Sequence, residues 1–158
     1  MGSGYEIREA TVGDAAEVHA LARELAETVG DAYPDEEAVR TRLGELLEGS
    51  GARVFVAEAE GGLAGVVSLW IKPDLAHGDA VIEVPMLVVS KDHRRNGVGG
   101  LLMARVQEVA AEHEASLIEL VATRANVAAR DFYKSLGFTE ADVVSLEFVG
   151  DVEDPPDG

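Results

Sequence analysis

Apolar residues recur at every third or fourth position in four stretches of the chain, a spacing that predicts amphipathic helices. The four predicted helices cover residues 15–29, 36–48, 98–113 and 127–136. Gly30 and Gly137 follow the first and the last of these stretches, where a left-handed C-cap residue is expected. Thr11 and Asp14 have the spacing of a capping box, so they predict the start of the first helix.

Six further runs are rich in β-branched residues and predict strands. They cover residues 5–10, 53–59, 63–71, 80–89, 117–121 and 143–149, and we expect a polar loop at 72–79. Gly61 and Gly62 separate the second run from the third, which predicts an antiparallel hairpin. Pro85 interrupts the fourth run, and because proline cannot donate to a strand ladder, we expect an edge or a bulge there. The order of helices and strands predicts one mixed α/β sheet.

The length of the chain, 158 residues, fits one domain, because a chain of this size buries roughly 68–70% of its unfolded surface in a single core. We expect this domain to occupy residues 1–150. Half of residues 151–158 are acidic, two are prolines and the segment has no apolar periodicity, so we expect a disordered tail. No apolar run approaches the ~18 residues of a membrane span, and the first residues lack the pattern of a signal peptide. We therefore expect a cytoplasmic protein that does not bind membranes.

Acidic residues dominate the composition. The chain has 30 Asp and Glu residues against 13 Lys and Arg residues, which gives a formal net charge of -17. This charge repels nucleic acids, which proteins bind through lysine and arginine, and it favours a cationic partner. Two explanations stay open, namely adaptation to salt or a high-GC genome, and an acidic face that attracts a substrate.

The chain contains no cysteine. This excludes disulfide bonds, a zinc site with thiolate ligands and a cysteine nucleophile, and we expect no metal. Any group transfer must therefore proceed without a cysteinyl intermediate.

The segment 88–103 runs from a predicted strand through a glycine-rich turn into a predicted helix, an arrangement that favours a bound anion. Three glycines let the backbone approach an oxygen closely: Gly97, Gly99 and Gly100. Three cations lie within five residues of one another: Lys91, Arg94 and Arg95. Neither a P-loop nor the dinucleotide fingerprint G-x-G-x-x-G is present, although a chance glycine loop in a nucleotide-binding protein stays open as a weaker alternative. A polyphosphate would explain such a cluster in an acidic protein.

Two motifs resemble those of the GNAT superfamily of N-acetyltransferases. Arg94-Arg-Asn-Gly97-Val-Gly99 is similar to the family's acyl-CoA signature R/Q-x-x-G-x-G/A. The segment 126–138 is similar to its second motif, N-x-x-A-x-x-F-Y-x-x-x-G-F. The resemblance covers the chain from about Tyr5 to Val149. It implies a mixed, mostly antiparallel central sheet flanked by helices, and acetyl-CoA (coenzyme A) as the acyl donor.

The resemblance also implies where acetyl-CoA lies. The pyrophosphate is expected on the backbone N–H groups from Arg95 to Leu101, and the pantetheine arm along the fourth strand, where that strand separates from the next. The residues expected to contact acetyl-CoA are Leu87, Val88, Val89, Arg94, Arg95, Asn96, Gly97, Val98, Gly99, Gly100, Leu101, Asn126 and Phe132. His93 is expected beside the phosphates. For Asn126 the alternative is an ordinary helix N-cap.

Two residues are expected to be catalytic by the same resemblance. Tyr133 would protonate the CoA thiolate, since an ordinary tyrosine is protonated at pH 7; the alternative is that its ring only packs. Glu83 would take the proton of the amine, and the alternative is a place on the solvent face of its strand. His77 and Asp79 are less favoured candidates for this base. Because cysteine is absent, we expect direct attack in a ternary complex, with the N–H of Val88 stabilising the oxyanion.

The acceptor is expected to be the primary amine of a small or peptidic molecule, and a cation. In the family the acceptor site is shaped by the loop between the first two helices, here 30–35, and by the last strands. Asp31, Asp35 and Glu36, in or beside this loop, could attract a cation, and the alternative is that they are solvated surface. A homodimer is a further expectation. The alternative function is a non-catalytic acyl-CoA-binding regulatory module.

Overall fold

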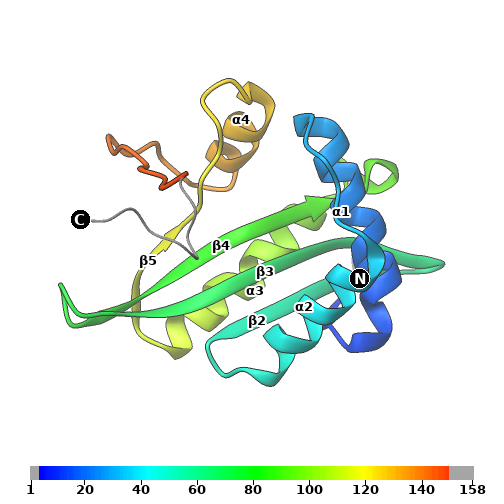
Figure 1. Ribbon diagram of the computed structural model, residues 1–158, viewed down its shortest axis with the longest axis horizontal. Helices are drawn as coiled ribbons and strands as arrows, with labels where there is room; N and C mark the ends of the chain where they lie inside the picture. Colours follow the sequence, from blue (N-terminus) through cyan, green and yellow to red (C-terminus); the bar gives the residue numbers. More distant parts are fainter. Residues whose placement is uncertain (1–3, 150–158) are drawn as a thin grey trace.

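The computed structural model describes residues 4–149 and contains a five-stranded sheet with helices on both faces (Figure 1). The strands are β1 (Glu6–Glu9), β2 (Ala52–Ala59), β3 (Gly62–Asp74), β4 (Asp79–Val89) and β5 (Ala115–Glu119). The helices are α1 (Ala15–Val29), α2 (Glu36–Glu48), α3 (Val98–Glu112) and α4 (Val127–Ser135). Two short 3-10 turns, Val12–Asp14 and Lys91–His93, precede α1 and the glycine-rich turn.

The sheet is mixed and mostly antiparallel, as the resemblance implied. The strands lie in the order β1-β2-β3-β4-β5, with antiparallel pairing up to β4 and parallel pairing between β4 and β5. The predicted hairpin between β2 and β3 is confirmed, and its two glycines have positive φ angles, +95° at Gly61 and +143° at Gly62. The parallel pair requires a crossover, and α3 supplies it.

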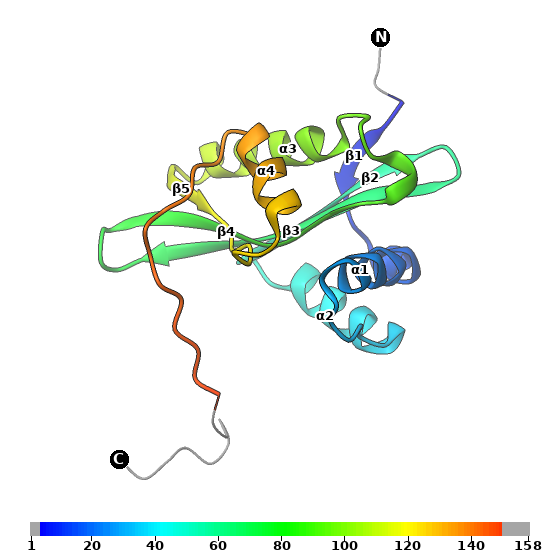
Figure 2. The same ribbon diagram turned by 90° about the horizontal axis from the view of Figure 1, so that it is seen from above.

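Two hydrophobic cores hold the helices on the sheet. Figure 2 shows α1 and α2 on one side of the sheet and α3 and α4 on the other. The core beneath α1 and α2 includes Val18, Leu21, Leu43, Val56 and Val66. The core beneath α3 includes Phe55, Leu69, Ile82, Leu102 and Val106. Each such fully buried side chain contributes about 1.5–3 kcal/mol, so packing on both faces fixes the central strands.

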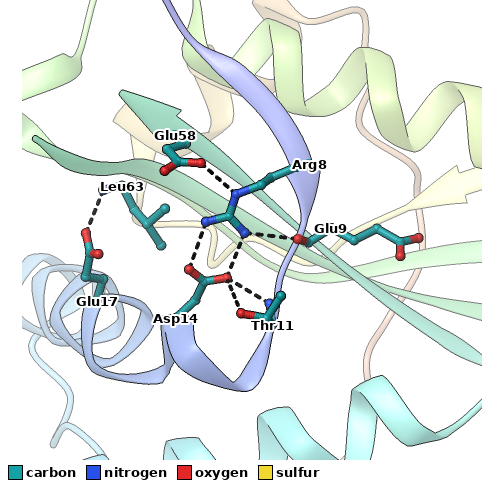
Figure 3. A network of polar contacts seen from close by, with 7 residues as sticks. All are labelled: Arg8, Glu9, Thr11, Asp14, Glu17, Glu58 and Leu63. Atoms are coloured by element: carbon teal, nitrogen blue, oxygen red, sulfur yellow. Dashed lines mark hydrogen bonds and ion pairs between the residues drawn. The ribbon is translucent and has the colours of Figure 1, made fainter. Parts of the chain in front are cut away.

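An ion-pair network ties β1 to β2 and to the start of α1 (Figure 3). The Arg8 guanidinium donates to both oxygens of Asp14, at 2.9 and 2.9 Å, and to Glu58 on β2 at 2.7 Å. Asp14 also accepts the backbone N–H of Thr11 at 2.8 Å, which confirms the predicted pairing of these two residues at the helix start. The hydrogen bond from Arg8 holds the pKa of the buried Asp14 below its ordinary value, against the effect of desolvation. The network therefore connects β1, β2 and the start of α1.

The predicted polar loop at 72–79 is wrong over half of its length. β3 continues to Asp74 and β4 begins at Asp79, so only four residues form the turn. The Asp74 carboxylate accepts the N–H of Ala76 at 2.9 Å, and the Asp74 carbonyl accepts the N–H of Gly78 at 2.7 Å. Polar residues here extend a two-stranded hairpin beyond the core, where their side chains reach water.

The predicted strand at 143–149 is also wrong, because residues 139–149 form neither helix nor strand. Its alternating apolar side chains are exposed, with Val144 at 83% and Leu146 at 90%. Alternation satisfies only the local requirement for a strand, which also needs a neighbour for its N–H and C=O groups. The predicted tail 151–158 lies outside the described residues.

We expect Asp14→Asn to lower the free energy of unfolding by about 1–3 kcal/mol at pH 7, because Arg8 loses a charged hydrogen-bond partner. The pKa of Asp14 is lower in the folded state, so its contribution is present above the ordinary value of 3.8 and is lost as the pH falls below it. Urea unfolding at several pH values measures both effects. The difference between the parent and the variant should shrink below pH ~4, and Asp142→Asn, at an exposed position, is the control.

Candidate active site

β4 separates from β5 halfway along its length. The two strands are paired from Ala80 and Ala115 as far as Glu83 and Glu119, whereas β4 stays paired with β3 up to Val89. The register between β3 and β4 shifts where Ser68 faces Met86 and Trp70 faces Glu83, so Val84 and Pro85 share the place opposite Leu69. This is the bulge that the proline predicted. Because the pairing with β5 ends at Glu83, the edge of β4 that faces β5 has no strand partner from residue 84 onward among residues 4–149.

A glycine-rich helix start lies directly beyond the end of β4. Gly97 is the N-cap of α3 in a left-handed conformation, with φ +78°, and no side chain caps the helix. The N–H of Leu101 donates to the Gly97 carbonyl at 3.1 Å, which leaves Val98, Gly99 and Gly100 as first-turn donors without an intrahelical acceptor. The helix dipole adds about half a positive charge at this end.

Three cations surround this helix start. The side chains of Lys91, Arg94 and Arg95 form no ion pair within residues 4–149, and all three residues are exposed. Arg95 has a φ of +68°, an uncommon conformation for a residue with a side chain, and such strain concentrates at functional loops. His93 accepts or donates a hydrogen bond with the Tyr5 hydroxyl at 3.1 Å, which places it at the base of the same loop. Together these residues form a site that fits a polyanion.

α4 packs against the helix start through Phe132. A Cβ atom added to Gly99 would lie 2.4 Å from Cζ of the Phe132 ring, so Gly99 has a packing reason to be glycine. The sequence alone suggested only close approach by a ligand. None of the residues of α4 is buried, and Phe132 is 37% exposed, so this contact is small. Asn126 caps α4 by accepting the N–H of Ala129 at 3.1 Å, so the alternative role considered for it is present.

Tyr133 points from α4 toward the α3 side of the sheet. Its ring packs against the core beneath α3 and makes edge-on contacts with Phe132 and Phe138, with centroids 5.4 and 5.8 Å apart. Burial raises the pKa of the Tyr133 phenol above its ordinary value, so the hydroxyl is protonated at neutral pH. Within the described chain no hydrogen bond engages this hydroxyl. The Tyr133 ring therefore packs against the core, and its hydroxyl carries the proton that a general acid needs.

Glu83 lies at the last paired position of β4 and β5, on the other face of the sheet. Its neighbours Ile82 and Val84 are buried in the core beneath α3, against which Tyr133 packs. Because successive side chains of a strand point to opposite faces, the Glu83 side chain faces away from Tyr133. The Glu83 carboxylate accepts a hydrogen bond from Nζ of Lys72 on β3, and this bond raises the pKa of Lys72. The Glu83 side chain is 35% exposed. No role was expected for Lys72, although it lies two residues after Trp70 on β3, so that both side chains share the face of Glu83.

The less favoured bases lie far from the helix start. His77 occupies the turn between β3 and β4, and Asp79 begins β4, ten residues before Val89. Nδ1 of His77 donates a hydrogen bond to Oδ2 of Asp74 at 2.7 Å, and that contact raises the pKa of His77 and lowers the pKa of Asp74. At about 3.3 Å per residue, Asp79 lies roughly 33 Å along the strand from Val89. The structure therefore separates these two residues from the anion site.

A mixed sheet whose parallel pair separates beside a basic helix start without a side-chain cap is the fold that solved acetyltransferase structures share. The chain belongs to the acetyltransferase (GNAT) family, whose sequence model matches residues 16–138. No curated protein matches the chain. Among residues 4–149, no helix is long and apolar enough to cross a membrane.

Solved structures share the fold at low sequence identity. A transcriptional regulator from Bacillus halodurans C-125 is 22% identical, with a TM-score of 0.80, over 91% of this chain and 98% of that chain. Ribosomal-protein-alanine N-acetyltransferase from Brucella melitensis is 24% identical, with a TM-score of 0.75, over 92% and 98%. Glucosamine-6-phosphate N-acetyltransferase from Arabidopsis thaliana is 17% identical, with a TM-score of 0.76, over 92% and 99%. The names of these three proteins differ in activity and substrate, so their likeness shows the fold.

The contact between Phe132 and Gly99 predicts a difference between adjacent glycines. Gly99→Ala should displace the exposed Phe132 ring, lower stability by about 1 kcal/mol and speed amide exchange in α4. Gly100→Ala is the matched control, because its Cβ would lie 3.9 Å from Leu136 and alanine favours a helix by about 0.5–1 kcal/mol. Thermal unfolding and hydrogen exchange measure the two effects. If Gly99→Ala remained equally destabilising in a Phe132→Ala background, the assigned contact would be wrong.

Proposed function

We propose that this protein transfers the acetyl group of acetyl-CoA directly to a primary amine in a ternary complex. The observation that carries the proposal is the α3 start, where free N–H donors and unpaired cations adjoin the unpaired edge of β4. The donors of Val98, Gly99 and Gly100, with Arg94 and Arg95, suit the pyrophosphate. Leu87, Val88 and Val89 line the edge of β4 along which the pantetheine arm would lie. The remaining residues that would contact acetyl-CoA are Asn96, Gly97, Leu101, Asn126 and Phe132.

Acetyl transfer requires that the amine lose a proton and that the leaving thiolate gain one. An alkylamine with a pKa near ~10 is neutral in only about one molecule per thousand at pH 7. In the proposed step Glu83 takes the proton, the amine nitrogen bonds to the acetyl carbon, and the carbon–sulfur bond breaks. Tyr133 then gives its proton to the thiolate, and the backbone N–H of Val88 stabilises the oxyanion formed on the way. Solvent returns the proton from Glu83 to Tyr133.

The arrangement on two faces of the sheet supports this assignment. Tyr133 lies on the α3 side and Glu83 on the opposite side, and the unpaired edge of β4 lies between them. An acyl donor entering from the α3 side would present its thioester to an acceptor on the other side. A cationic acceptor is favoured by the net charge of -17. Cytoplasmic location and a homodimer stay predictions from the sequence.

A second function deserves a test because one of the structures of the same fold is named a transcriptional regulator. In that case the chain would bind an acyl-CoA without transferring the acyl group. Release of free thiol from acetyl-CoA in the presence of a panel of amines separates the two functions. Bound acetyl-CoA without release under any condition would favour the regulatory module.

We expect Tyr133→Phe and Glu83→Gln each to lower kcat by roughly 10²-fold or more, because each removes a proton-transfer group. Arg94→Ala should raise the KM and Kd for acetyl-CoA several-fold while kcat changes little. A side chain that only binds phosphate stabilises the bound substrate and the transition state equally. Steady-state thiol release and calorimetry with acetyl-CoA measure these quantities. The matched controls are Glu112→Gln and Arg40→Ala, two exposed positions on α3 and α2.

Unchanged thiol release by Tyr133→Phe would refute the proposed acid. An unchanged Kd for acetyl-CoA in Arg94→Ala would refute the proposed phosphate site.

A further inference from the structure

A hollow opens on the face of the sheet that carries Glu83. It has a volume of about 530 Å³ and lies between the β3–β4 hairpin and β5. Its lining includes Lys72, Asp74, Asp79, Leu117 and Glu119. No residue given a role in the acetyl-CoA site takes part in this lining.

The hollow leads to the proposed base. Glu119, in its wall, is the partner of Glu83 in the last rung between β5 and β4. Lys72, also in its wall, donates its ammonium hydrogen bond to Glu83. The hollow therefore adjoins Glu83, the group that would take the proton of the acceptor amine.

Negative charge dominates the side chains around this path. Four carboxylates, Asp74, Asp79, Glu119 and Glu83, stand against Lys72 and His77, and the hydrogen bond with His77 lowers the pKa of Asp74. Oδ1 of Asp79 is shielded from solvent and has no hydrogen-bond partner within the described residues. A carboxylate oxygen in this state gains more from a cation than an exposed, hydrated one does.

Lys72 shows what kind of group this surface accommodates. Its side chain is itself an alkylammonium, and its charge is stabilised first by the hydrogen bond to Glu83 and also by Glu119. Half of the side chain is exposed, at 51%, so the pair is worth little and an incoming ammonium can displace it. The single tryptophan, Trp70, faces Glu83 in the ladder and is 43% exposed, which offers an aromatic face beside the same carboxylate.

We propose that the acceptor is an alkylamine with a second ammonium group, which binds in this hollow while the reacting amine reaches Glu83. Asp79 and Glu83 are four residue steps apart, which corresponds to ~13 Å of strand, a span that a short diamine bridges together with the side chains at each end. The second ammonium would contact Asp79, with Asp74 facing it in the ladder, and the reacting amine would take the place of the Lys72 ammonium beside Glu83 and Glu119. This inference rests on the proposed acetyl transfer and names its substrate class.

The test compares 1,4-diaminobutane with n-butylamine as acceptors of the full-length protein. We expect kcat/KM to be at least tenfold higher for the diamine at low salt, with the preference decreasing as salt is added. Asp79→Asn should reduce kcat/KM for the diamine at least threefold, through KM, and leave the value for butylamine unchanged, whereas Glu119→Gln, beside Glu83, should reduce both values. Asp142→Asn, at an exposed position outside the hollow, should change neither.

Calorimetric titration of the diamine without acetyl-CoA provides a readout besides activity. Binding by the parent that is weakened in both variants supports the inference, and Glu119→Gln, at an exposed position, guards against a folding defect in Asp79→Asn. Equal kcat/KM for the diamine and butylamine would overturn the inference while the proposed acetyl transfer stood. Diamine binding without thiol release from bound acetyl-CoA would keep the hollow as a diamine site and refute the transfer. A preference for a neutral or acidic acceptor would overturn the inference as well.

Discussion

The parting of β4 from β5 after Glu83 and Glu119 is the constraint on which the candidate site depends. β4 is held by β3 along nearly its whole length, so it keeps its place when β5 leaves it. The bulge at Val84 and Pro85 adds a residue at this point, and proline contributes no N–H to a ladder. The opening is therefore built into the backbone. Because of it, groups on both faces of the sheet can act on one reaction that takes place between them.

The acidic character of the chain and its anion site are compatible because the relevant fields have short range. At physiological salt, charges separated by more than ~8 Å are largely screened, so the α3 start is governed by its own N–H groups and the adjacent cations. The carboxylates around the hollow, Asp74, Asp79 and Glu119, act locally in the same way. The two ends of β4 thus have opposite electrostatic character: its C-terminal end leads to cations, and its N-terminal end lies among carboxylates.

The sequence predicted the elements whose signal is local and repeated. The helices, the β2–β3 hairpin, the Thr11–Asp14 pairing and the bulge at Pro85 all follow from spacing or from the chemistry of one residue type. The strand expected at 143–149 failed because pairing depends on where another segment lies, which alternation does not encode. The loop expected at 72–79 failed because polarity marks exposure rather than irregular backbone.

For the candidate site, the sequence predicted the glycine-rich start of α3 but not the residues that pack beside it. The packing of Phe132 on Gly99 and the bond between Lys72 and Glu83 join residues far apart in the chain, and only the folded register brings them together. The hollow beside Glu119 arises for the same reason, since β3, β4 and β5 each contribute to it. The capping of α4 by Asn126 shows the converse case, in which a residue assigned to a ligand already has a local partner.

The proposed acetyl transfer requires that the first turn of α3 bind the phosphates of acetyl-CoA through its backbone. The most direct measurement is the amide NMR spectrum of the protein with and without CoA, recorded with Gly44 and Gly49 as reference glycines remote from α3. If the first turn of α3 binds the phosphates, the amides of Val98, Gly99 and Gly100, which have no intrahelical acceptor in the free protein, should show large shifts and slowed exchange. Binding of CoA that left these three amides unchanged would contradict it.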